Sequence, residues 1–159
     1  DTLNIEAGTD ITIVTTPGSN TLTINSTATG GGGGGLVSRT TINTVASSLS
    51  GNTSINKEVI GGFGTYALLS IQTSSDAWVR LYTDQSSRTS DQSRLITDDP
   101  APDAGVIAEV ITTGAQTIKM SPGVIGWLTT GTNIPVRITN LQGSVQNITV
   151  TLTLVQLEA

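Results

Sequence analysis

The sequence contains no cysteine and no histidine. Without cysteine the chain forms no disulfide framework and has no thiolate chemistry. Without histidine it lacks the commonest general base and the commonest metal ligand. Catalysis at neutral pH would then need a carboxylate or a lysine with a strongly shifted pKa. We therefore expect no catalytic activity, no cofactor and no metal.

Positive charge and long apolar runs are also scarce. Seven Lys and Arg residues stand against twelve Asp and Glu, which gives a net charge of −5, and the basic residues are scattered. Nucleic-acid binding relies on clustered basic residues, so we expect no nucleic-acid partner. No apolar run approaches the length of a membrane span, so we expect no membrane association. Because the chain opens on Asp1 and not on Met, we expect a processed product or a fragment of a longer polypeptide.

Aromatic residues make up only 3% of the chain, whereas Thr, Ser, Val and Ile are abundant, a composition that favours strands. The strand signal covers residues 36–47, 55–60, 66–73, 77–83, 106–112, 117–120, 124–128, 134–139 and 147–154. The polar stretch 84–97 has room for one helical turn. Short strands with frequent turns predict an antiparallel β-sandwich of the jelly-roll type, and another Greek-key sandwich is the alternative.

The last of these strands has the clearest alternation in the chain. Apolar residues occupy every second position, and threonine or asparagine occupies the positions between them. Strict alternation is typical of a strand with one buried face. The residues expected to face the core are Ile148, Val150, Leu152 and Leu154.

The first 29 residues contain three short alternating runs, too few apolar side chains to offset the ordering entropy of the backbone. Such a segment needs a partner layer, most simply the same segment of neighbouring chains. We therefore expect residues 1–29 to be an oligomerising β stalk, 30–35 a flexible glycine linker and 36–159 the sandwich domain. The expected interface residues are Leu3, Ile5, Ile11, Ile13, Leu22 and Ile24.

Three clusters of side chains could carry chemistry. Asp98, Asp99 and Asp103 could bind calcium through their carboxylates, but carboxylates between prolines are usually solvated. A polar set could pair internally or across a subunit boundary, namely Arg80, Arg88, Asp91 and Arg94. The aromatic residues that could stack on a sugar, or fill the core instead, are Trp78, Tyr82 and Trp127.

No nucleophile–base pair can be proposed from the sequence. Glu109 lies in the apolar run 106–111 and is the one carboxylate whose pKa burial could raise. The favoured alternative is that it points out of a sheet edge or pairs with an arginine across the sandwich.

Two parts of the chain resemble proteins of tailed phages. Leu3 to Ile13, then Asn20 to Asn25 and the glycine run, resemble stalk segments of fibre and spike proteins. Residues 77–82, together with 98–100 and 105–110, resemble a small β domain in virion proteins of phages, cyanobacterial ones included. The resemblance implies a trimeric structural component of a virion and carries over no catalytic residue.

The expected function is therefore that of a tail fibre, spike or baseplate-associated virion protein. Its expected partners are its own copies in a homotrimer and other virion proteins. A host-surface glycan is a further candidate partner. The alternatives are a capsid-decoration or head-fibre protein and a carbohydrate-binding module on a cell-surface or fibre protein.

Overall fold

The structure is a computed structural model that describes residues 11–16, 18–19, 21–26 and 38–158. Contacts within the chain divide it into two units, residues 1–36 and 37–159. The expectations for Leu3, Ile5 and the glycine run lie outside the described residues.

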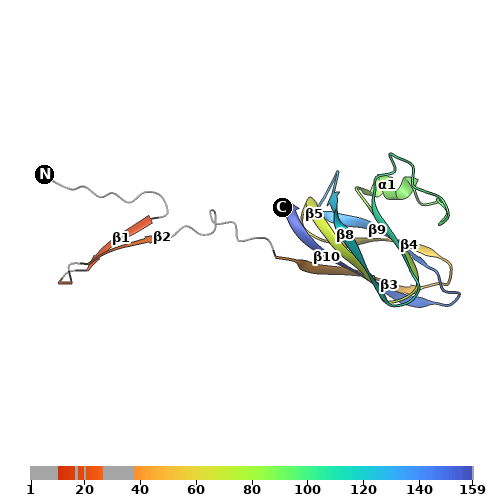
Figure 1. The fold of residues 1–159 in the computed structure, drawn as a ribbon, viewed down its shortest axis with the longest axis horizontal. Helices are drawn as coiled ribbons and strands as arrows, with labels where there is room; N and C mark the ends of the chain where they lie inside the picture. Colours follow the sequence, from red (N-terminus) through yellow and green to blue (C-terminus); the bar gives the residue numbers. More distant parts are fainter. Residues whose placement is uncertain (1–10, 17, 20, 27–37, 159) are drawn as a thin grey trace. The chain divides into compact units, whose positions relative to one another are not determined.

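The first unit contains a two-stranded antiparallel ribbon, β1 (Ile11–Thr16) and β2 (Thr21–Ser26) (Figure 1). Ile13 lies opposite Ile24 in the register. Since side chains alternate between the faces of a strand, Ile11 and Leu22 share that face, and Val14 lies on the other. The ribbon therefore gathers four of the six expected interface residues on one side.

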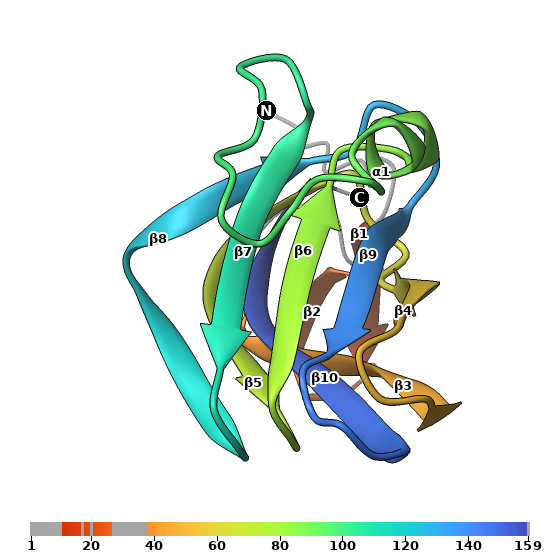
Figure 2. The same cartoon turned by 90° about the vertical axis from the view of Figure 1, so that its right-hand side faces the viewer.

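The second unit is an all-β sandwich with one short helix among the residues that the structure describes. Its elements are β3 (Thr40–Leu49), β4 (Ser54–Ile60), β5 (Thr65–Thr73), β6 (Ala77–Tyr82), α1 (Gln85–Ser90), β7 (Val106–Thr112), β8 (Gln116–Trp127), β9 (Asn133–Asn140) and β10 (Gln146–Glu158). One sheet has the strand order β3-β10-β5-β8 and the other β4-β9-β6-β7, with every pair antiparallel. Figure 2 shows the second sheet in front of the first, with α1 at one end. The expected all-β class is confirmed.

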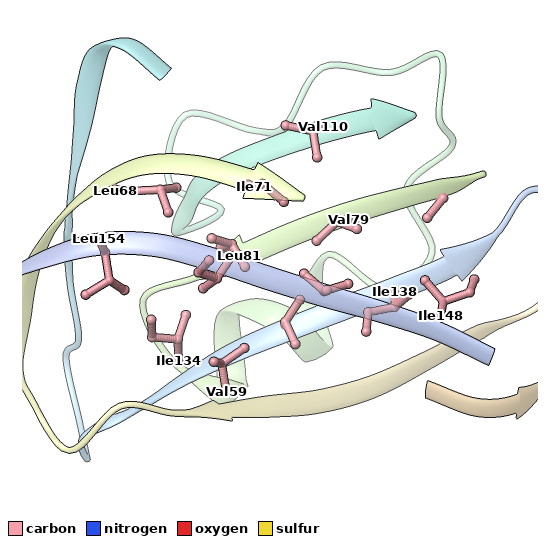
Figure 3. Packing of buried hydrophobic residues seen from close by; sticks show 14 of the residues in the cluster. Val59, Leu68, Ile71, Val79, Leu81, Val110, Ile134, Ile138, Ile148 and Leu154 are labelled. Atoms are coloured by element: carbon pink, nitrogen blue, oxygen red, sulfur yellow. The ribbon is translucent and has the colours of Figure 1, made fainter. Parts of the chain in front are cut away.

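The core lies between the two sheets and is built almost wholly from aliphatic side chains (Figure 3). All four residues predicted to face it from β10 are fully buried, so that prediction is confirmed: Ile148, Val150, Leu152 and Leu154. Leu81 of β6 and Ile134 of β9 meet them from the opposite sheet. Alternation with period two thus identified the buried face of β10 correctly.

The structure differs from the expected strands at residues 117–128. The two short strands expected on either side of Pro122 and Gly123 form one strand, β8. Its pairing with β5 shifts register between Leu68 and Ser70, so that residues 120–123 of β8 bulge out of the ladder. A proline is tolerated at a bulge on an edge strand because no ladder hydrogen bond is lost there. The proline was therefore not the strand break that the sequence suggested.

Gly126 of β8 allows a close approach between two strands. It lies opposite Tyr66 of β5, and a Cβ at Gly126 would lie 2.5 Å from Cζ of the buried Tyr66 ring. We expect Gly126→Ala to lower the free energy of unfolding by about 1–3 kcal/mol, because the packed ring must move. Urea denaturation monitored by circular dichroism measures this loss. Gly143→Ala is the control, since nothing lies within 4 Å of a Cβ there. Equal stability of the two variants would contradict the packing of Tyr66 on Gly126.

Candidate functional site

The described side chains on the apolar face of the β1–β2 ribbon are largely exposed. The exposed fraction is 60% for Ile24 and 44% for both Ile11 and Leu22, while Ile13 is half-buried. Val14, on the other face, is exposed by 44% as well. A two-stranded ribbon cannot bury its own apolar side chains, so they contribute little to stability until another layer packs on them.

Both faces of β6 are buried. In a sandwich the face of a strand that points away from the core is usually exposed to solvent, so the burial of this outer face needs an explanation. All six residues of β6 are buried, including Trp78, Arg80 and Tyr82 on the side away from the core. The segment that follows α1 crosses the outer side of β6 and β7 (Figure 2). Trp78 and Tyr82 are therefore packing residues, and their interpretation as part of a sugar platform is wrong.

Asp91 is the centre of a polar cluster beneath this segment. Its Oδ2 accepts hydrogen bonds from Arg80 Nη1 at 3.0 Å and from the Tyr82 hydroxyl at 2.7 Å. Its Oδ1 accepts one from Arg94 Nε at 2.7 Å. The Arg80 side chain is only 1% exposed and that of Asp91 4%. Three donors from two elements thus converge on one buried carboxylate.

Arg94 extends the cluster outward to the edge of the sheet. Its Nη2 contacts Glu109 Oε2 at 2.5 Å, and its Nη1 donates to the backbone carbonyl of Asp98 at 2.7 Å. The guanidinium groups of Arg80 and Arg94 lie 3.7 and 5.2 Å from the ring centroid of Trp78, which adds cation–π attraction. Glu109 is exposed on the edge strand β7, as the first of the two expectations had it. It also pairs with an arginine, but Arg94 comes from the loop after α1, so the expected partner across the sandwich is wrong.

The positive groups of this cluster hold the Asp91 carboxyl ionised. Burial alone would raise the pKa of Asp91, but hydrogen bonds from Arg94 and Tyr82 and the charges of Arg94 and Arg80 outweigh burial and lower it. Burial, aided by the bond to Asp91, raises the pKa of the Tyr82 hydroxyl. Arg88 does not join the cluster, since its Nη1 donates to the backbone carbonyl of Lys57 at 2.5 Å. Of the four polar residues singled out in the sequence, three form one network.

Three carboxylates of the loop after α1 face solvent. Asp98, Asp99 and Asp103 are exposed. In the part of the chain that the structure describes, no three Asp or Glu side chains lie close enough together to hold a metal ion.

A groove of about 640 Å³ opens where this loop meets the end of β8. Its walls include Pro100, Pro102 and Asp103 of the loop and Ile125 and Trp127 of β8. Trp127 is 56% exposed, so among the three aromatic residues proposed for sugar stacking it alone presents a large exposed surface. Volumes of roughly 300–1,000 Å³ are typical of small-molecule sites. The sequence pointed to Trp127 but contained no signal for the loop that faces it.

The backbone at the rim of the groove is held by the carboxylate of Asp84, which caps α1. Its Oδ1 accepts the backbone N–H of Ser87 at 2.7 Å, and its Oδ2 accepts the Thr129 hydroxyl at 2.8 Å. These hydrogen bonds, that of the Ser87 backbone first, lower the pKa of Asp84. Both carboxylate oxygens of Asp84 therefore already accept hydrogen bonds within the chain.

No protein-family model matches this chain, and no curated protein is significantly similar to it. Within the described ranges, the one helix is far too short to cross a membrane.

Proposed function

We propose that this protein is a structural component of a phage virion, a homotrimeric tail fibre, spike or baseplate-associated protein whose sandwich serves assembly or host attachment. The exposed aliphatic side chains on one face of the β1–β2 ribbon carry the proposal. Three ribbons placed around a common axis would bury this face, and closed symmetry is the usual solution for such self-association. The proposal includes no catalytic role, nucleic-acid partner or membrane contact.

The strand order of the sandwich supports the finer description of a jelly roll. Each four-stranded sheet alternates strands from the two halves of the sequence, and two Greek keys on eight strands produce such an order. Jelly rolls are used in viral capsid proteins among other classes, so the fold is compatible with a tail or a head position. A capsid-decoration or head-fibre role remains the alternative within the same proposal.

The oligomeric state is the first test. We expect light scattering of the full chain to give three times the chain mass of 16.3 kDa. The double variant Ile13→Asp, Ile24→Asp should be monomeric, because it places charges at a facing pair in the centre of the apolar side. Val14→Asp on the opposite face is the matched control and should stay trimeric. A monomeric wild type, or dissociation of both variants alike, would refute the proposed interface, and a dimer would refute the fibre analogy.

The virion assignment needs a separate test. Mass spectrometry of gradient-purified particles of the phage that encodes this chain should detect it in copy numbers that are multiples of three. Labelling with an antibody to the sandwich in electron micrographs then separates a tail from a head position. Absence of the chain from washed, infectious particles would overturn the assignment even if the isolated protein is trimeric.

A further inference from the structure

The groove beside Trp127 has a rigid frame. Gly105, at φ +66°, brings the loop so close to Thr83 and Ser87 that a Cβ there would lie 2.6 Å or less from their hydroxyl oxygens. The Gly105 carbonyl accepts the backbone N–H of Thr83 at 2.9 Å, and the Thr83 carbonyl accepts that of Thr129 at 3.0 Å. Two residues before Pro100, the carbonyl of Asp98 accepts a hydrogen bond from Arg94 Nη1. The groove is therefore formed before anything enters it.

The lining of the groove combines one broad aromatic surface with oxygen atoms. Ile125 and Trp127 are the large apolar side chains of β8 in this lining, and the hydroxyl-bearing residues Thr83, Ser87 and Thr129 line the groove as well. Asp103 also lines the groove, and none of the described residues makes a hydrogen bond to its carboxylate. This carboxylate is thus free to accept hydrogen bonds from a ligand.

The charge of the lining selects among ligands. The groove is lined by the carboxylates of Asp84 and Asp103 and by no lysine or arginine. Phosphates, sialic acids and uronic acids would meet negative charge without a compensating cation. A neutral sugar fits this lining, because its C–H face packs on an aromatic ring while its hydroxyls donate to carboxylate and threonine oxygens.

We propose that this groove binds a neutral sugar unit of a glycan, stacked on Trp127 and hydrogen-bonded to Asp103. A second hollow of about 610 Å³ shares the lining residues Asp84 and Thr129 with the groove, and its lining also includes Thr130, Asn133 and the acidic residue Glu58. We expect the second hollow to take the neighbouring sugar unit of the same glycan. The proposal deepens the host-attachment part of the proposed function and rests on it for its biological role, but the groove lies within one sandwich and does not need the trimer.

Calorimetric titration of the full chain with defined oligosaccharides tests the site. The neutral series are gluco-, galacto-, manno- and N-acetylglucosamine oligosaccharides, and oligogalacturonate and oligosialic acid form the anionic arm. We expect millimolar or tighter binding of at least one neutral series and none of the anionic ones. Trp127→Ala should weaken binding by roughly tenfold or more, and Trp127→Tyr should largely restore it, because stacking needs only an aromatic face.

Two controls separate this site from the fold and from the oligomer. Val145→Ala removes an equally exposed apolar side chain in the β9–β10 loop, at the end of the sandwich away from α1, and should bind like the wild type. The monomeric variant Ile13→Asp, Ile24→Asp should also retain binding, so a failed trimer and a failed groove give different results. Acrylamide should quench part of the tryptophan fluorescence of the assembled protein. Because Trp78 is buried and Trp127 is exposed, the quenched part reports on Trp127.

Four outcomes would overturn the proposal. The first is that no neutral series binds, and the second is that only the anionic sugars bind. The third is that wild type and Trp127→Ala bind equally well. The fourth is that acrylamide does not quench Trp127 in the assembled protein. The last result would mean that another copy of the chain covers this face.

Discussion

Replacing Asp91 with alanine is expected to lower the free energy of unfolding by about 3–5 kcal/mol, since breaking a buried ion pair leaves its partner charge uncompensated. The charge left without a partner is that of Arg80, whose side chain is 1% exposed. The Tyr82 hydroxyl and Arg94 lose an acceptor at the same time. Chemical denaturation at pH 7 measures the loss.

The control for this variant is Asp99→Ala, which removes an exposed carboxylate from the same loop. Its effect should stay within about 0.5 kcal/mol, as is usual for surface substitutions. If the two variants were equally stable, the cluster would contribute nothing to holding the loop on β6.

Asp91 also gives the stability a defined pH dependence. Its pKa is lower in the folded chain than the ordinary aspartate value of about 3.9 in the unfolded chain. The unfolded state therefore binds more protons around that pH, so the stabilisation is complete above it and is lost as the pH falls below it. Asp84 acts in the same direction. We expect the urea midpoint to fall as the pH is lowered from about 5 to about 3, and to fall less steeply for Asp91→Asn.

Leu152→Ala is expected to cost about 2–5 kcal/mol of unfolding free energy, because it opens a cavity at a fully buried site. Leu152 lies in the centre of β10, which pairs with β3 on one side and with β5 on the other. The surrounding strands are held by both ladders and cannot collapse easily into the space. Denaturant melts of the full chain measure the effect.

Thr151→Ala is the matched control on the neighbouring position of β10. Its side chain points to the other face of the sheet and is half-buried, so its removal leaves no cavity in the core. A loss below about 0.5 kcal/mol for Leu152→Ala, of the size of an ordinary surface substitution, would contradict the assignment of the core face.

The all-β class and the buried face of β10 could be predicted from the amino acids alone. Alternation is a local property: each apolar residue is two positions from the next, and a strand turns both to the same side. The same property placed Ile11 with Ile13 and Leu22 with Ile24. Which strand each one meets is not local, and the pairing of Ile13 with Ile24 became visible only in the register.

The buried outer face of β6 and the groove beside Trp127 depend on contacts between residues distant along the chain. Trp78, Arg80 and Tyr82 alternate as an exposed polar face would, but they are buried, and the segment after α1 crosses this side of β6. Asp91 and Arg94 lie in a polar stretch without periodicity, so their convergence on β6 has no local signal. Periodicity reports which side a residue faces, whereas the tertiary structure alone determines whether that side meets water, a loop or an open groove.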